Sequence, residues 1–430
     1  MISRVMSADL PAHIGERVTI AGWLHRRREL KSVTFLVVRD MCGLAQVVLP
    51  AHVRCEIPEE TVLQVEGLVV GNAQAPGGAE LTEPVLTRLS GPATPPPFDL
   101  YRPTLTATLP TILDYAPTTL RHPLLRAGFE ISAASAAGFR AALDRLGFTE
   151  IFTPKIVESA TESGANVFGI DYFGRPAYLA QSPQFYKQAM VGVFERVYEV
   201  GPAFRAEPHD TARHLAQYAS LDAELGFITD HYDVMAVCRD AIAGMLESVA
   251  ERGSSAMRLL SAALPWVPAE IPHIHFAEAM DLISRETGDD VTGEPDLAPA
   301  HERWLCEWAE REHGSELLFV TGYPLASKPF YTHPDPGRPG YTNGFDLLFR
   351  GTEIVTGGQR LHRHEDYLAA LAARGMNPDP YASYLQVFEH GMPPHGGFAI
   401  GLERFTARLT GAANVRQVTL FPRDLHRLSP

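Results

Sequence analysis

Residues 197–226 read VYEVGPAFRAEPHDTARHLAQYASLDAELG and predict two strands joined by a polar loop. The first strand delivers Arg205 to the loop, and the returning strand carries two carboxylates, Asp222 and Glu224. Short apolar runs bounded by turn residues are typical of β-strands. A string such as Phe-Arg-Ala-Glu can also be a surface ion pair, so the hairpin alone assigns no function.

Further elements are predicted on both sides of this hairpin. Helical spacing over 120–146 ends at Gly147, a candidate C-cap, and a strand follows over 148–154. An amphipathic helix is predicted over 231–252, with Asp230 as its N-cap. Additional strands are predicted over 178–179, 317–321, 343–349, 353–358 and 397–400, with helices after Arg363 and Glu403. Strands without intervening helices favour a mixed or antiparallel sheet.

A proline-rich stretch, GPATPPP at residues 91–97, divides the chain. Proline fixes φ and lacks an amide donor, so this stretch cannot continue a helix or a central strand. Before it lie five short β-rich runs, at 18–23, 34–39, 45–49, 62–69 and 85–89. They fit an OB-fold, although a generic small barrel without an RNA role fits equally well. We therefore predict an α+β multidomain protein, with domain boundaries at 1–90, 91–118 (linker) and 119–430.

Composition favours a folded protein in a reducing compartment, and we expect a cytoplasmic location without membrane partners. Hydrophobic residues make up 45% of the chain, yet no apolar run is long enough to span a membrane. The four cysteines lack CxxC spacing, which argues against a zinc site or a disulfide framework. The net charge of −14 does not exclude RNA, because phosphate binding needs only a local patch such as Arg26-Arg27-Arg28 with Lys31.

Three segments, in the right order behind the barrel, resemble the motifs of class II aminoacyl-tRNA synthetases. The hairpin over 197–226 resembles motif 2, and the glycine-rich strand and helix over 396–408, ending in Gly401-Leu402-Glu403-Arg404, resemble motif 3. The segment 121–154 resembles motif 1, which builds the dimer interface in this family. The resemblance implies a homodimer and a catalytic domain with a central antiparallel sheet flanked by helices. It covers nearly the whole chain, except residues 253–312, which carry no chemical signature.

The stretch QSPQFYK at residues 181–187 looks like the amino-acid pocket of aspartyl-tRNA synthetases. Aspartate carries two carboxylates and an ammonium group, so its site needs both signs of charge. The resemblance assigns Lys187 and Arg360 to the side-chain carboxylate of aspartate. The Lys187 ammonium and the planar Arg360 guanidinium would reject the neutral amide of asparagine. It assigns the ammonium end to Glu162, Gln184 and Asp222. Taken alone, Lys187 reads more simply as a solvated helix lysine.

The same resemblance assigns the ATP site. Arg205 would bind the α-phosphate and, with Arg404, is predicted to be catalytic. Glu207 would read the adenine amino group and Tyr218 would stack on the ring. The β- and γ-phosphates are assigned to His214 and Arg404 beside Gly401, and Mg²⁺ bound with ATP is assigned to Glu353 and Thr356. Zinc is not expected, because His333, His362 and His364 lack metal-ligand spacing. Lys328 lies in a segment that resembles the family's closing loop.

The N-terminal domain resembles the anticodon-binding barrel of these enzymes. Phe35 would stack on an anticodon base, unless it is a barrel-core residue, and Arg26 with its neighbours would neutralise phosphates. Gln46 and Glu66 would read base edges nearby. His25 and Pro84 occupy two positions at which, in this family, the same pair of residues accompanies relaxed tRNA specificity. The resemblance therefore predicts that the enzyme charges tRNA-Asn as well as tRNA-Asp. An amidotransferase would later use the aspartyl-tRNA-Asn.

The predicted substrates are thus L-aspartate, ATP and tRNA, in an enzyme of the shorter, archaeal-type form, since no large domain separates motifs 2 and 3. Three alternatives stay open. The enzyme could discriminate against tRNA-Asn, or it could be an asparaginyl-tRNA synthetase, against which the SPQ-x-x-K stretch argues. It could also be a non-catalytic RNA-binding paralogue, although such relics usually lose a motif arginine and both Arg205 and Arg404 are present.

Overall fold

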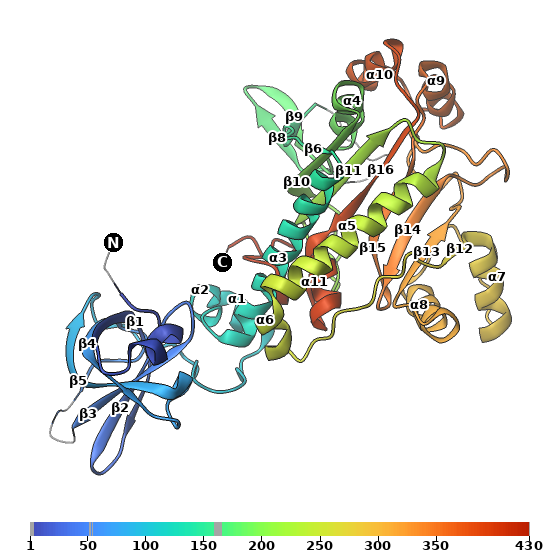
Figure 1. Cartoon of the computed structure of the whole chain (residues 1–430). Coiled ribbons are helices and arrows are strands. Elements are labelled where there is room, and N and C mark those ends of the chain that lie inside the picture. Colours follow the sequence, from blue (N-terminus) through green and yellow to red (C-terminus); the bar gives the residue numbers. More distant parts are fainter. Residues whose placement is uncertain (1–3, 51–52, 54, 159–165, 430) are drawn as a thin grey trace. The chain divides into compact units, whose positions relative to one another are not determined.

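The computed structural model describes residues 4–50, 53, 55–158 and 166–429, in two compact units that divide between His122 and Pro123. In the first unit, five strands close into a barrel in the order β1-β2-β3-β5-β4 (Figure 1). The strands are β1 (Arg17–Glu29), β2 (Val33–Arg39), β3 (Leu44–Pro50), β4 (Val62–Gly71) and β5 (Ala79–Arg88). This barrel confirms the predicted OB-fold. Its inward-facing side chains form a core of their own that includes Leu24, Leu36, Val47 and Leu63.

Strand β5 is longer than expected, because the prediction found only its second half. Glu83 adopts a positive φ of 49°, and Pro84 follows it, so the alternation of apolar residues is interrupted there. The remaining elements of this unit are short: η1 (Ser7–His13), η2 (Pro76–Gly78), α1 (Leu109–Asp114) and α2 (Ala116–Thr119). The first compact unit extends to His122, so it contains the proline-rich stretch and helices α1 and α2 as well as the barrel.

An eight-stranded mixed sheet forms the centre of the second unit, in the order β12-β13-β14-β15-β16-β11-β10-β6. Its strands are β6 (Thr149–Glu150), β10 (Arg196–Phe204), β11 (Gln217–Gly226), β12 (His273–His275), β13 (Leu317–Thr321), β14 (Gly344–Phe349), β15 (Thr352–Gln359) and β16 (His395–Gly401). Neighbouring strands are antiparallel except at the two ends of the sheet, where β12 pairs with β13 and β6 with β10 in parallel. A separate small sheet contains β7 (Ile156–Val157), β8 (Gly169–Tyr172) and β9 (Arg175–Leu179).

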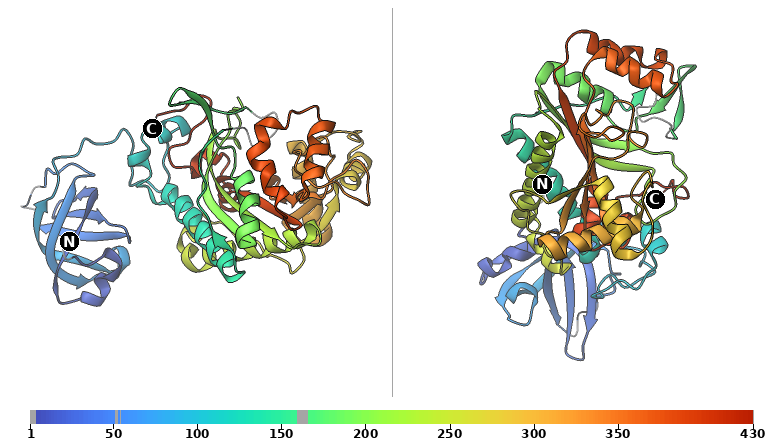
Figure 2. Two further views of the ribbon diagram at one scale, coloured as in Figure 1. Left: turned by 90° about the horizontal axis from the view of Figure 1, so that it is seen from above. Right: turned by 90° about the vertical axis from the view of Figure 1, so that its right-hand side faces the viewer.

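Two long helices, α3 (Pro123–Arg145) and α5 (His231–Arg252), pack against each other and cover one face of this sheet (Figures 1 and 2). Their ends follow the predicted caps: Gly147 has a φ of 78°, and the Asp230 side chain accepts a hydrogen bond from the Tyr232 amide. The expected helix over 120–146 begins only at Pro123, because α2 precedes it as a separate turn.

The other helices are shorter. They are α4 (Gln184–Phe194), α6 (Ser254–Leu259), α7 (Phe276–Thr287), α8 (Pro299–His313), α9 (His364–Ala373), α10 (Ala382–Glu389) and α11 (Leu402–Thr410), with η3 (Asp379–Tyr381) and η4 (Val415–Val418). Within the described part of the chain, none of the helices is long and apolar enough to cross a membrane.

Candidate active site

A cavity of about 530 Å³ lies in the second unit, lined by residues of β11, β15, β16 and α4. It brings together every described residue that the sequence assigned to aspartate or ATP. These residues are Gln184, Lys187, Arg205, Glu207, His214, Tyr218, Asp222, Glu353, Thr356, Arg360, Gly401 and Arg404. Lys328 also lines the cavity. Glu162 lies outside the described residues.

Strand β11 forms one continuous wall of this cavity, because successive side chains of a strand point to opposite faces. Leu221, Ala223 and Leu225 belong to the core that contains α3 and α5. The alternate residues Tyr218, Ser220 and Asp222 therefore face the other way and line the cavity. A single strand face thus runs from the residue assigned to adenine to the residue assigned to the amino acid.

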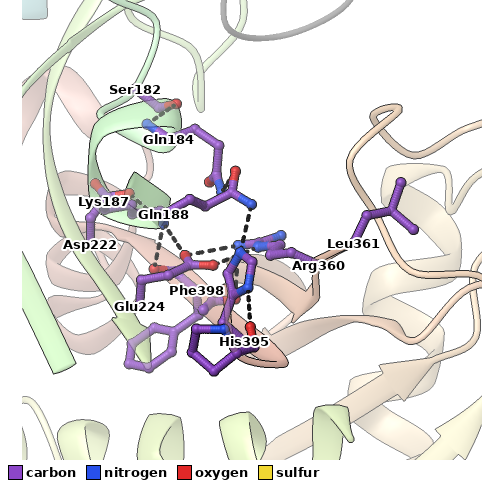
Figure 3. Close-up of polar contacts among 12 residues, drawn as sticks. Ser182, Gln184, Lys187, Gln188, Asp222, Glu224, Arg360, Leu361, His395 and Phe398 are labelled. Carbon is purple, nitrogen blue, oxygen red and sulfur yellow. Dashed lines mark hydrogen bonds and ion pairs between the residues drawn. The ribbon is translucent and has the colours of Figure 1, made fainter. Parts of the chain in front are cut away.

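At the end of the cavity to which the sequence assigned the amino acid, a buried carboxylate, Glu224, joins Lys187 and Arg360, the two predicted cations (Figure 3). Lys187 Nζ lies 3.3 Å from Glu224 Oε2, and Arg360 Nε donates to Glu224 Oε1 at 2.9 Å. Lys187 Nζ also donates to Asp222 Oδ1 at 3.0 Å. Burial acts to raise the pKa of Glu224, but Arg360 and Lys187 outweigh it and hold the pKa below its usual value.

Strand β16 leaves room for this carboxylate by placing a glycine opposite it. Gly397 is the direct strand partner of Glu224, and a Cβ at Gly397 would lie 2.0 Å from Glu224 Oε2. The Gly397 carbonyl also accepts a hydrogen bond from Arg360 Nη2 at 3.0 Å. The glycine of motif 3 at position 397 is therefore explained by sterics, because a side chain there would collide with Glu224.

The loop between β10 and β11 forms the end of the cavity to which the sequence assigned ATP. The Arg205 amide donates to Ala216 O at 2.9 Å, which extends the hairpin beyond the last β10 residue and fixes where the Arg205 side chain starts. Burial, together with Arg404 and Arg213, lowers the pKa of His214 to about 4. At neutral pH His214 is therefore an uncharged hydrogen-bonding group, and the positive charge at this end comes from the arginines.

Glu353 and Arg404 meet where motif 3 enters helix α11. Arg404 Nη1 donates to the Glu353 carbonyl at 2.9 Å and lies 3.5 Å from Glu353 Oε1. Burial raises the pKa of Glu353 to about 7 against the opposing effect of Arg404, and the neighbouring carboxylates of Asp346 and Glu302 raise it further. Glu353, Asp346 and Glu302 therefore repel one another on this wall, and a bound cation would favour the ionised form of Glu353. Within the described residues, no group of three or more His, Cys, Asp or Glu side chains is arranged to hold a metal ion.

In the barrel, three of the predicted RNA contacts lie on one outer face. Val37 of β2 pairs with Arg26 of β1 on one side and with Gln46 of β3 on the other, and Phe35 is two residues from Val37. Directly paired residues and residues two apart share a face. Phe35 is half-buried rather than a member of the barrel core. Arg26 stacks over the Tyr101 ring at 4.1 Å.

The other three predicted contacts lie elsewhere in the barrel. Glu66 is on β4, where it pairs with Arg17 at 3.4 Å. The side chain of Gln46 donates to Glu80 at 2.7 Å. Pro84 follows the positive-φ residue of β5.

His25 is buried, and its Nδ1 accepts a hydrogen bond from Arg39 Nη1 at 2.8 Å. Arg39 in turn forms a two-pronged ion pair with the buried Glu60, at 2.9 and 2.8 Å. Burial, followed by the charge of Arg39, lowers the pKa of His25 to about 4. His25 is therefore a neutral acceptor that positions Arg39, and any effect of this residue on RNA would pass through that network.

Two family models match the chain. Residues 109–425 match "tRNA synthetases class II (D, K and N)", and residues 18–88 match "OB-fold nucleic acid binding domain". The first match includes every residue that lines the cavity. The chain belongs to the class II aminoacyl-tRNA synthetases.

Individual relatives and solved structures show which members of the family this chain is similar to. This synthetase is 49% identical over 427 residues to the aspartate--tRNA(Asp/Asn) ligase of Thermus thermophilus, a match that covers 99% of this chain and 100% of the relative. Identity to the ligase of the same name from Deinococcus radiodurans is 45%, covering 100% of this chain and 99% of the relative. The crystal structure of asparaginyl-tRNA synthetase from Pyrococcus horikoshii with asparaginyl-adenylate superposes with a TM-score of 0.93 at 31% identity, covering 100% of both chains. The predicted family, fold class and enzyme class, an aminoacyl-tRNA ligase, are confirmed.

Two site residues of this synthetase were not assigned from the sequence. Glu224 could have been found, because Ser220, Asp222 and Glu224 alternate along one strand and must share a face. Glu302 lies in the segment 253–312 that carries no signature. The structure places it in α8, buried, where it accepts a hydrogen bond from the Glu353 amide at 3.3 Å and from Arg213 at 2.7 Å. The unassigned segment thus braces the motif 2 loop against the strand that carries Glu353.

Proposed function

We propose that this synthetase forms aspartyl-adenylate from L-aspartate and ATP and transfers the aspartyl group to tRNA-Asp and tRNA-Asn. The observation that carries the proposal is the convergence of Lys187 and Arg360 on Glu224 at one end of the cavity. Two cations held in place there suit a ligand that ends in a carboxylate. The names of the Thermus and Deinococcus relatives support the same substrate.

Aspartate recognition follows from the charges at this end. Lys187 and Arg360 hold the side-chain carboxylate, and Gln184 and Asp222 hold the ammonium group, with Glu162 assigned to the same end. Asparagine would present a neutral amide to two buried cations. Because a site built for one polar group rejects an analogue that leaves buried groups unpaired, selection by a factor of roughly 10⁴ is within reach of binding alone.

Activation needs positioning rather than a general base, because a carboxylate is already a nucleophile. An oxygen of the aspartate α-carboxylate attacks the α-phosphorus of ATP, and the bond to the departing diphosphate breaks. Arg205 stabilises the charge on the α-phosphate as the new bond forms. Arg404 and His214 hold the outer phosphates, Glu207 reads the adenine, and Tyr218 stacks on it. In the second step a hydroxyl of the tRNA attacks the aspartyl carbonyl and AMP leaves.

The residues assigned to Mg²⁺ fit a hard cation. Glu353 is a partly buried carboxylate whose pKa is raised to about 7 by burial and by Asp346 and Glu302, so a divalent charge would relieve the repulsion there. Glu353 and Thr356 offer the oxygen ligands that Mg²⁺ prefers, with the remainder supplied by phosphate and water. When bound, the ion neutralises phosphate charge.

We further infer that the enzyme is a homodimer and that it is located in the cytoplasm. An amidotransferase in the same compartment would act on the aspartyl-tRNA-Asn. The segment 121–154, which resembles motif 1, supports the dimer, because its Phe152 is 81% exposed, and Ile156, two residues beyond the segment, is 47% exposed. Exposed apolar residues of this size in a sequence segment used for dimerisation are typical of a subunit interface.

Parallel aminoacylation tests the substrate range. Both tRNA transcripts are charged with aspartate, and exchange of pyrophosphate into ATP is measured with aspartate, asparagine and lysine in turn. We expect exchange with aspartate only, and charging efficiencies for the two tRNAs within about tenfold, that is within roughly 1.4 kcal/mol. Charging of tRNA-Asn a thousandfold below tRNA-Asp would refute the relaxed specificity, and exchange with asparagine alone would make the enzyme an asparaginyl-tRNA synthetase.

Replacing Phe35 by alanine tests the barrel. A stacked base contributes roughly 1–3 kcal/mol, so kcat/KM for tRNA should fall about 5- to 150-fold. Aspartate-dependent pyrophosphate exchange should stay unchanged, because that reaction needs no tRNA. Val48→Ala, a truncation of the residue paired with Phe35 on β3, serves as the matched control and should lose much less. Equal losses in the two variants would show that Phe35 acts through barrel stability.

A further inference from the structure

A second layer of polar side chains contacts residues at the end of the cavity assigned to the amino acid, and Figure 3 shows two of its members, Gln188 and His395. It consists of Gln188 of α4, His395 of β16, Tyr367 of α9 and Tyr384 of α10. All four are buried, with exposed fractions of 5% or less, and none of them lines the cavity. Polar groups at this depth are costly unless each finds a partner, so their hydrogen bonds define what the layer does.

Gln188 is the centre of this layer. Its Oε1 accepts hydrogen bonds from Tyr384 Oη at 2.8 Å and from Gln184 Nε2 at 3.0 Å. Its Nε2 lies 3.1 Å from Tyr367 Oη and 3.0 Å from His395 Nε2. A carboxamide offers two donor hydrogens and two acceptor lone pairs. The four contacts use all of them.

The partners of Gln188 allow only one orientation of its amide. His395 Nδ1 lies 2.9 Å from the Pro393 carbonyl, which can only accept, so Nδ1 carries the proton and Nε2 is an acceptor. Burial lowers the pKa of His395 to about 4, which keeps the ring neutral at physiological pH. Tyr367 Oη donates to the Leu361 carbonyl at 2.8 Å and therefore receives the second Gln188 hydrogen. A flipped amide would set its oxygen against two acceptors.

The orientation of the Gln188 amide also fixes the orientation of the Gln184 amide, and Gln184 does line the cavity. Because Gln188 Oε1 is an acceptor, the Gln184 group that meets it must be the amide nitrogen. The Gln184 carbonyl oxygen is then the acceptor of that side chain. An ammonium group needs acceptors, and a reversed amide would oppose it with donor hydrogens.

We propose that Gln188 and His395 are positioning residues that hold Gln184 with its carbonyl oxygen ready for the α-ammonium group of the substrate. The inference rests on the proposed function, in which aspartate is that substrate. It also gives helices α9 and α10 a role, since their tyrosines complete the hydrogen bonds of Gln188 without reaching the cavity.

Comparing aspartate with succinate isolates this effect, because succinate keeps both carboxylates and lacks the ammonium group. Dissociation constants of both ligands are measured for the full-length enzyme and for Gln188→Met, which keeps the side-chain length but loses the amide. We expect aspartate to bind roughly 5- to 100-fold more weakly to the variant, while succinate changes less than twofold and the KM for ATP stays constant.

Tyr384→Phe is a milder variant that keeps the ring and removes the hydroxyl that contacts Gln188 Oε1 at 2.8 Å and Tyr367 Oη at 3.0 Å. It should weaken aspartate binding by roughly two- to tenfold and leave succinate unaffected. Tyr381→Phe removes a hydroxyl from the same aromatic cluster without touching Gln188 and should change neither ligand.

Equal weakening of aspartate and succinate in both Gln188→Met and Tyr384→Phe would overturn the inference, because it would mean that the layer supports the whole pocket. Failure of the proposed function would appear differently, as an absence of aspartate-dependent exchange in the unmodified enzyme.

Discussion

Replacing Arg360 by methionine is expected to lower kcat/KM for aspartate by at least a hundredfold and to destabilise the catalytic domain. The guanidinium is buried, donates to Glu224 at 2.9 Å and to the Gly397 carbonyl at 3.0 Å, and lines the cavity. Removing one partner of a buried ion pair costs about 3–5 kcal/mol, because a buried charge is left uncompensated. Lys187 alone would then have to balance Glu224 and the incoming carboxylate.

Two measurements check this expectation. Aspartate-dependent pyrophosphate exchange gives kcat/KM for aspartate and, separately, KM for ATP, which should change little. Thermal unfolding reports the loss of stability. Arg363→Met is the matched control, since Arg363 is exposed and outside the cavity lining, and it should behave like the unmodified enzyme. An Arg360→Met enzyme with an unchanged KM for aspartate would contradict the assigned role.

Replacing Arg205 by glutamine should abolish nearly all activation while leaving the fold intact. Removing a group that stabilises developing charge typically costs a factor of about 10²–10³ in kcat. The hairpin should survive, because the backbone bond from the Arg205 amide to Ala216 O does not involve the side chain.

The expected signature is a fall in kcat for pyrophosphate exchange with an unchanged unfolding temperature. Arg196→Gln, at the start of strand β10, provides the control, because that exposed arginine contacts the Leu146 carbonyl and does not line the cavity. A loss of less than about threefold in the Arg205 variant would exclude transition-state stabilisation by this residue.

Much of the fold could be predicted because local patterns were strong. The alternation and turns before the proline-rich stretch predicted the barrel, and helix α5 begins and ends at the predicted residues 231 and 252. Strand β6 could not be predicted at its true length. Only Thr149 and Glu150 pair, because β10 offers a short parallel register at the sheet end and the chain then leaves the sheet.

The assigned site residues that the structure describes lie together in one cavity, although their roles stay predictions. The cavity collects the residues of motifs 2 and 3, because hairpin pairing fixes them. Glu302 and His395 act through side-chain contacts with distant segments, such as Arg213 and Gln188, and no local spacing encodes such contacts. In the barrel, the contact between Gln46 and Glu80 was likewise not predicted, because it depends on the parallel pairing of β3 with β5.

The single strand face that carries Tyr218, Ser220, Asp222 and Glu224 makes correct refolding measurable. A slip of one residue between β11 and β16 would turn all four side chains inward and would place Glu224 beside Gly396 or Phe398 instead of Gly397. Such a molecule would lose the wall assigned to adenine and the wall assigned to the amino acid together, so a slipped species should have no exchange activity. After dilution from denaturant, the recovered exchange rate would therefore count the molecules whose strands had found their native register.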